Sequence, residues 1–301
     1  MKNHYYIKVI LTSIILHFFW FEPDAIFAQD QKIGPSVIMS GNFLGESPPL
    51  KELPALTEAD MALMTEKGKQ KILNPTLKNR SYPYAESALP KGPDPLWQRS
   101  MGSNRNTRSP LQIFEGGLTS TLAPTDPNGT IGPEHYMQTI NTVYTIYNRA
   151  GDVVAGPTNI NELFYGVSGS GYNDGDPIVL YDEQADRWLL AEFSISGSND
   201  YLMIAVSTTN DPTGTWYKYS FDVWDVPDYP KFGVWRDGYY IGTNTYGYPD
   251  IYALQRSEML IGGSSPGGIG FDNPWRPGPS NDFMCVPPLD NDGEFAPDGE
   301  P

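Results

Sequence analysis

Three aspartates stand at matching places in a repeated pattern and could together carry acid–base chemistry on a sugar. Asp126 begins Asp126-Pro127, Asp176 begins Asp176-Pro177, and Asp228 begins Asp228-Tyr229-Pro230, with intervals of 50 and 52 residues. Glycosidic bond cleavage needs two carboxyl groups facing across the bond, one ionised and one protonated. The same repetition fits turn chemistry, in which Asp caps a loop and Pro ends it. Both interpretations stay open.

Further residues could support such a site. Glu192 lies among apolar residues of an expected strand and is a second candidate for the acid. The candidate ligand-binding residues are polar or aromatic and lie near strand ends: His135, Asn141, Tyr229, Tyr240 and Asn244. Exposed aromatic rings stack on sugars, but buried ones fill the gaps between sheets, so a packing role is the alternative for this group.

Two loops place oxygen ligands close together, as Ca²⁺ requires. They are Asn173-Asp174-Gly175-Asp176 and Asp290-Asn291-Asp292-Gly293, and neither has the spacing of an EF-hand. Asp174, Asp176, Asp290 and Asp292 are therefore candidate ligands of a structural Ca²⁺, with solvated turn carboxylates as the alternative. No other cofactor is expected. The single Cys285 excludes multi-cysteine metal sites, and His135 is the one histidine beyond the first twenty residues.

The net charge limits the partners. The chain has 36 Asp+Glu against 20 Lys+Arg, a formal charge of −16, and no basic cluster. Such a surface repels phosphate backbones and anionic membranes, so a nucleic-acid partner is not expected. Aromatic residues reach 13% and charged residues only 19%, a composition that favours a folded protein.

Residues 1–28 have the pattern of a secretory signal peptide. Lys2 and Lys8 precede a mostly apolar run from Val9 to Phe21, which is shorter than the roughly 20 residues needed to span a bilayer. We expect cleavage near Ala28, no membrane span in the mature chain, and a secreted, periplasmic or cell-surface location in a bacterium. An uncleaved anchor is the alternative.

The mature chain divides into an arm and a strand-rich region. Residues 29–110 are Pro-rich and read as an irregular arm with one short helix over 57–72, where Thr57 and Asp60 resemble a capping box. Residues 111–301 contain short β-branched and aromatic runs separated by turn residues. The expected strands are Tyr136–Asn141, Val143–Tyr147, Ile178–Tyr181, Trp188–Ser194, Leu202–Ser207, Trp216–Phe221, Tyr239–Asn244 and Ile251–Gln255.

The repeat predicts an all-β fold, specifically a β-propeller. In each repeat the Pro-containing turn precedes an aromatic-led strand and then an outer strand, and periods of about 40–50 residues are typical of propeller blades. A β-sandwich is the alternative. Three repeats begin at Asp126, and 287–293 resembles the opening of a fourth. We therefore expect an incomplete propeller and a chain that is a fragment of a longer protein.

Three resemblances refine this picture. The run from Thr209 to Trp216 resembles the Asp-box turn of sialidase-like propellers, whose role is structural. The Asp126, Asp176 and Asp228 motifs resemble, in order, the acidic motifs of invertase-, levanase- and arabinanase-like five-bladed glycosidases. That resemblance implies a nucleophile or base, a transition-state stabiliser and an acid, although Asp228 replaces the usual Glu.

The third resemblance covers about two thirds of the chain. From about Asp94 onward, and most clearly over 126–141, the sequence is similar to exported bacterial propeller proteins of unassigned activity. This implies export and a propeller, but no reaction. Our expectation is a secreted or cell-surface propeller that binds an extracellular glycan or protein. A glycoside hydrolase is the runner-up, and a purely structural surface protein is the third possibility.

Overall fold

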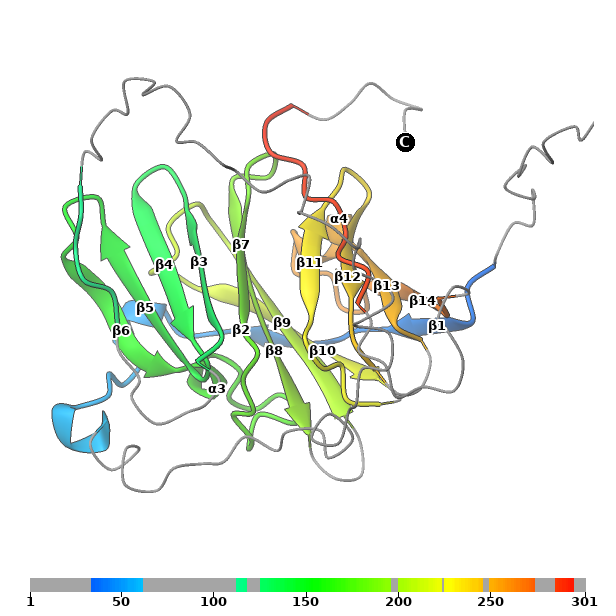
Figure 1. The fold of residues 1–301 in the computed structure, drawn as a ribbon, viewed down its shortest axis with the longest axis horizontal. Helices are drawn as coiled ribbons and strands as arrows, with labels where there is room; N and C mark the ends of the chain where they lie inside the picture. Colours follow the sequence, from blue (N-terminus) through cyan, green and yellow to red (C-terminus); the bar gives the residue numbers. More distant parts are fainter. Residues whose placement is uncertain are drawn as a thin grey trace, which may run out of the picture. The chain divides into compact units, whose positions relative to one another are not determined.

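Short runs of β-branched and aromatic residues form most of the regular structure, because such side chains fit a pleated, half-buried surface. The computed structural model describes residues 34–61, 112–117, 125–195, 200–223, 225–245, 249–273 and 285–294. The expected signal peptide and most of the Pro-rich arm lie outside these ranges. Within them, the strands form three antiparallel sheets (Figure 1). The expectation of an all-β protein is confirmed.

Each sheet contains a four-stranded meander, in which neighbouring strands follow one another along the chain. The first consists of β3 (Pro127–Ile131), β4 (His135–Ile140), β5 (Val143–Asn148) and β6 (Val153–Asn159). The second consists of β7 (Ile178–Asp182), β8 (Arg187–Ile195), β9 (Asp200–Ser207) and β10 (Trp216–Val223). The third consists of β11 (Lys231–Val234), β12 (Gly238–Gly242), β13 (Ile251–Gln255) and β14 (Gly267–Phe271). Short helices α3 (Ile160–Leu163) and α4 (Arg256–Met259) follow β6 and β13.

The N-terminal arm is not irregular where it is described. β1 (Val37–Ser40) pairs with β14, and β2 (Asn42–Glu46) pairs with β10, so each extends a meander to five strands. Figure 1 shows both in blue along the sheet edges. A 3₁₀ turn, η1 (Leu50–Glu52), follows. These strands were not predicted because both segments are short and mix apolar with polar residues, and their regularity comes from pairing with the edge of an existing sheet.

A helix begins after Thr57, as its capping box predicts. The Thr57 N–H and hydroxyl donate to Asp60 Oδ2 at 2.8 and 2.6 Å, and the Asp60 N–H donates to Thr57 Oγ1 at 3.1 Å. These reciprocal bonds satisfy N–H groups that the first helical turn leaves without partners. The remainder of the expected helix, 62–72, lies outside the described residues.

The core lies between the sheets. One apolar cluster fills the space between the first and second sheets, and another fills the space between the second and third. Along β8, Leu189 faces the third sheet and Leu190 faces the first, which is the two-residue period of a strand buried on both faces. The second sheet therefore packs against both neighbours.

The Asp211 side chain closes the turn between β9 and β10, within the run from Thr209 to Trp216 that resembles an Asp-box. Asp211 Oδ1 accepts bonds from the N–H and hydroxyl of Thr213 at 2.9 and 2.7 Å. The Trp216 ring is fully buried in the cluster between the first two sheets, and its indole N–H donates to the Pro212 carbonyl at 3.0 Å. The motif is therefore structural in this protein.

A buried ion pair joins the second sheet to the third. Asp182, at the end of β7, accepts bonds from Nε and Nη2 of Arg256 in α4 at 2.6 and 2.8 Å. The Tyr239 hydroxyl on β12 donates to the same carboxylate at 3.0 Å. This clamp, formed by Asp182, Arg256 and Tyr239, fixes one end of β7 against the third sheet.

The first strands of the three sheets are neighbours. β3 contacts β7, and β7 contacts β11. The Asn128 side chain on β3 accepts a 2.8 Å hydrogen bond from the N–H of Val179 on β7. Because all three strands begin just after a Pro-containing turn, the residues of those turns are brought together.

Candidate functional site

Asp126, Asp176 and Tyr229 occupy equivalent positions at the starts of the three sheets. Each immediately precedes a proline, and each has a left-handed backbone with φ of 40°, 51° and 53°. This conformation costs a non-glycine residue about 1–3 kcal/mol, and residues strained in this way cluster at active sites and ligand-binding sites. The third equivalent residue is therefore Tyr229 and not Asp228, because the third repeat has one extra residue between Asp and Pro.

Lys231 lies among the side chains of these turns. It interacts electrostatically with Asp176, Asp126 and Asp228. Its Nζ lies 3.6 Å from the centre of the Tyr229 ring and donates to the Pro230 carbonyl at 3.0 Å. Burial lowers the pKa of Lys231, although the neighbouring Cys285 and the three carboxylates act in the opposite direction. We call Asp126, Asp176, Asp228, Tyr229 and Lys231 the strand-start cluster.

Backbone and amide donors hold two of the carboxylates in place. Asp176 is 8% exposed, and its Oδ2 accepts a 3.2 Å bond from the N–H of Tyr229 in the next sheet. Asp228 Oδ2 accepts a 3.2 Å bond from the amide of Asn244, whose own N–H donates to the Asp228 carbonyl at 2.8 Å. These bonds fix the orientation of both carboxylates.

The Tyr229 ring is the accessible aromatic surface of the cluster. It is 44% exposed, whereas most large aromatic residues of the fold are buried. Cys285 lies beside it, with its thiol 3.8 Å from the Tyr229 carbonyl oxygen, and burial raises the pKa of that thiol. The cluster thus combines acceptor oxygens, one ammonium group and an exposed ring.

Asn141 and Asn244 follow β4 and β12 at the cluster end of the first and third sheets, since Pro127 pairs with Ile140 and Lys231 with Gly242. Both are buried, at 2% and 3% exposure. Asn244 holds Asp228, as described above, so the structure brings it into the site as a supporting residue.

Glu192 does not reach the surface. It lies on β8 with 1% exposure, and burial raises its pKa well above the usual range, with the nearby Asp174 adding to the shift. A protonated carboxyl is what a glycosidase acid requires. However, a side chain enclosed in this way cannot touch a bound sugar.

His135 and Tyr240 lie away from the cluster, which differs from our expectation. His135 begins β4, at the end that pairs with the last residues of β3 and β5, whereas Asp126 precedes the first residue of β3. The Tyr240 hydroxyl donates to Asp237 in the turn between β11 and β12, at the far end of β11 from Lys231. Both residues lie on strands that pair with the first strand of a sheet. However, His135 and the partner of Tyr240 lie toward the end of the sheet that is far from the strand-start prolines.

The four candidate Ca²⁺ ligands do not form one site. Asp174 Oδ2 accepts a 2.7 Å bond from the Ile195 N–H, and Asp176 bonds to Tyr229. Asp290 accepts a 2.9 Å bond from the Val234 N–H at the opposite end of β11, and Asp292 acts on it electrostatically. Among the described residues, no group of three or more His, Cys, Asp or Glu side chains is arranged to hold a metal ion.

Sequence reasoning missed Lys231. The signal was present, because the residue after the strand-start proline is Asn128 in the first repeat and Ile178 in the second, and only the third places a charge there. The resemblance of the third motif to an acidic motif rests on Asp228 and says nothing about the lysine three residues later.

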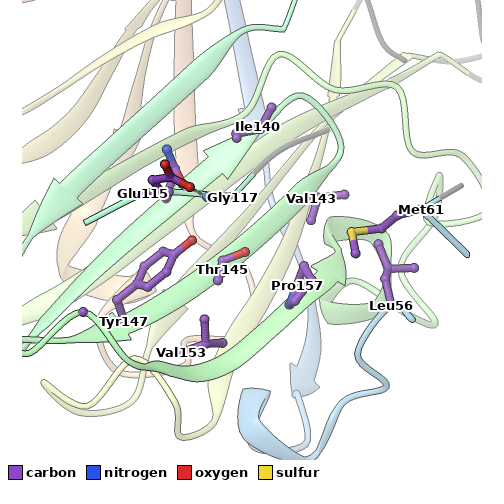
Figure 2. Close-up of a pocket in the computed structure, with 13 residues that line it drawn as sticks. Leu56, Met61, Glu115, Gly117, Ile140, Val143, Thr145, Tyr147, Val153 and Pro157 are labelled. Atoms are coloured by element: carbon purple, nitrogen blue, oxygen red, sulfur yellow. Dashed lines mark hydrogen bonds between the residues drawn. The ribbon is translucent and has the colours of Figure 1, made fainter. Parts of the chain in front are cut away.

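A partly enclosed apolar hollow of about 350 Å³ lies on the face of the first sheet that points away from the second. In Figure 2, Leu56 and Met61 lie at one end of the hollow, and Glu115 and Gly117 lie at the other. Its remaining lining residues come mainly from the first sheet: Gly116, Gln138, Ile140, Val143, Thr145, Tyr147, Gly151, Val153 and Pro157. The hollow offers few charged groups and was not foreseen from the sequence.

The register explains why this face is apolar. Counted from the strand-start proline, Gln138 on β4 corresponds to Leu190 on β8 and Ile241 on β12. Leu190 packs against the first sheet and Ile241 against the second. In the second and third sheets, the corresponding face packs on the sheet that comes before it in the chain. In the first sheet, this face carries the hollow. Part of it is covered here by residues 112–117, where the Gly117 N–H donates to Gln138 at 2.8 Å.

No helix in the described ranges has the length and apolar character needed to cross a membrane. Comparison of the chain with protein-family models, with curated proteins and with solved structures gives no significant match.

Proposed function

We propose that the protein is an exported binding protein of the β-propeller type, which recognises a neutral glycan through the strand-start cluster. The observation that carries this proposal is the convergence of three strained turn residues, Asp126, Asp176 and Tyr229, around the half-buried Lys231. Left-handed backbone at bulky residues and desolvation of an ammonium group both cost stability. Features of this kind are concentrated at functional sites.

The propeller part of the proposal is supported by the repetition of the sheets. Three meanders begin at prolines in matching positions, their first strands are adjacent, and their faces pack on one another in sequence order. These are the relations between successive blades of a propeller. The hollowed face of the first sheet is then the place where a further blade would pack.

The ligand class follows from the chemistry of the cluster. Three carboxylates and one ammonium group carry a net negative charge, which favours hydroxyl donors and disfavours sulfated or uronic-acid sugars. The exposed Tyr229 ring offers a flat apolar surface for the C–H face of a sugar. A neutral hexose-containing glycan satisfies both requirements.

A glycoside hydrolase is the less favoured candidate. The raised pKa of Glu192 would suit an acid, but its 1% exposure keeps it from a substrate. Asp176 and Asp228 are held by hydrogen bonds from Tyr229 and Asn244, which is consistent with fixed acceptors in a binding site. If the protein were a hydrolase, Asp126→Asn would abolish measurable turnover of the sugar.

The test is a glycan array followed by calorimetric titration of the best neutral ligand. We expect Asp126→Asn to weaken binding by about 10- to 100-fold, because a hydrogen bond to a charged group contributes about 1.5–3 kcal/mol. Tyr229→Ala should weaken it about 3- to 10-fold through loss of stacking.

Matched controls separate binding from folding. Asp222→Asn changes an exposed aspartate on β10, and Tyr165→Ala removes an exposed ring after α3. Both should bind as the wild type does. Wild-type binding to acidic glycans alone, or unchanged affinity in the two cluster variants, would argue against the proposal.

A further inference from the structure

Glu192 is buried without the partners that a carboxyl group requires. The Gly175 N–H lies close enough to lower the pKa of the carboxyl as a weak backbone hydrogen bond, but neither Glu192 oxygen has a partner of good hydrogen-bond geometry. The corresponding residues of the other two sheets are Ile140 and Thr243, so the repeat needs no ionisable group here. Because burying an unpartnered carboxyl is costly, its presence requires another explanation.

Other unpartnered oxygens lie close to the same loop. Thr142 Oγ1 and Asn173 Oδ1 are buried and have no hydrogen-bond partner. The Asn173 amide nitrogen donates to the Thr142 carbonyl at 3.0 Å and to Asn159 Oδ1 at 3.4 Å, which fixes the orientation of the amide. Asp174 follows directly and interacts electrostatically with Glu192. Oxygen atoms that could bind a cation therefore gather at this loop.

We propose that Glu192, Asp174, Asn173 and Thr142 bind one Ca²⁺ ion. Ca²⁺ takes six to eight oxygen ligands in flexible geometry and combines carboxylates with amide and carbonyl oxygens and water, whereas Mg²⁺ demands a stricter octahedron. Two carboxylates with neutral oxygens are sufficient, so the site does not need a third acidic ligand. In this site Glu192 joins Asp174 as a Ca²⁺ ligand in place of Asp176, whose carboxylate accepts a hydrogen bond from the Tyr229 N–H.

The surroundings favour a cation. Asp200 at the start of β9 interacts electrostatically with Asp174 and with Asp225, which places further negative charge near the loop. Thr142 belongs to the turn after β4 in the first sheet, and Glu192 belongs to β8 in the second. A bound ion would therefore join the two sheets and should stabilise the folded chain.

The test is calorimetric titration of chelator-treated full-length protein with CaCl₂, together with thermal unfolding at increasing Ca²⁺ concentration. We expect one Ca²⁺ per chain and an unfolding midpoint that rises with Ca²⁺. Glu192→Gln, which keeps the shape but removes the charge, should weaken binding at least tenfold. The control Glu134→Gln makes the same change at an exposed position and should leave the affinity unchanged.

The wild-type titration decides the proposal even if Glu192→Gln fails to fold. Absence of both binding heat and a thermal shift would overturn it. Asn173→Ala keeps both carboxylates and serves as the second variant, for which we expect weaker binding. If Glu192→Gln and Asn173→Ala both bound Ca²⁺ as tightly as the wild type, the ion would lie elsewhere, and the proposal would also be overturned.

Discussion

Replacement of Asp182 by Asn tests how the second and third sheets are held together. Asp182 is 1% exposed and accepts bonds from Arg256 Nε and Nη2 at 2.6 and 2.8 Å. The Tyr239 hydroxyl and the Ala185 N–H each donate a further bond at 3.0 Å. Asn has nearly the same shape but no charge, so the buried guanidinium of Arg256 would lose its counter-charge. Removal of one partner of a buried pair costs about 3–5 kcal/mol.

Urea unfolding, followed by circular dichroism, measures this loss. We expect the free energy of unfolding of Asp182→Asn to fall by about 3–5 kcal/mol, while Asp222→Asn, exposed on β10, stays within about 0.5 kcal/mol of the wild type. The double variant Asp182→Leu with Arg256→Met replaces the pair by apolar side chains and should recover much of the loss. A loss below about 1 kcal/mol in Asp182→Asn would refute the described packing of β7 against α4.

Two further predictions concern the strand-start cluster and the turn between β9 and β10. Because burial lowers the pKa of Lys231, its side chain binds fewer protons in the folded chain than in the unfolded chain, and its own contribution to stability should rise with pH from about pH 8 to pH 10. The raised pKa of Cys285 acts in the opposite direction, so the informative quantity is the difference between the wild type and Lys231→Met. In urea unfolding at the two pH values, the free energy of unfolding of the wild type should increase relative to that of Lys231→Met. The variant should not be destabilised at neutral pH. A free energy of unfolding that falls with pH in the wild type relative to the variant would contradict the assigned burial of Lys231. Asp211→Ala removes two hydrogen bonds to Thr213 and should cost about 1–2 kcal/mol, against no measurable loss for Asp222→Ala.

The strands with strong local patterns were predictable. All eight expected strands are present, and no bound differs by more than two residues. β3, β6, β11 and β14 were missed because glycine and proline interrupt their patterns, as in Gly267–Phe271, where Gly268 and Gly270 face Leu254, Met39 and Val37. Such strands depend on close packing by neighbours, and propensity does not reveal it.

The meeting of the three turns was predictable from the sequence, whereas the side chains that the turns bring together were less so. The repeated Asp-Pro motif correctly indicated that three turns meet, because equivalent strand starts lie at the same end of adjacent sheets. The extra residue in the third motif puts Tyr229, and not Asp228, directly before the proline, and the left-handed backbone of Tyr229 confirms that it is the equivalent of Asp126 and Asp176. The strand ends at which His135 and Tyr240 lie depend on hairpin register, which the sequence motifs did not specify.

The measurement that tests the glycan-binding proposal most directly is a crystal structure of the protein with its best neutral glycan. We predict that a sugar ring stacks on Tyr229 and that its hydroxyl groups donate to carboxylates of the strand-start cluster. A glycan bound elsewhere, for example in the hollow of the first sheet, with Tyr229 and Lys231 unoccupied, would contradict the proposal.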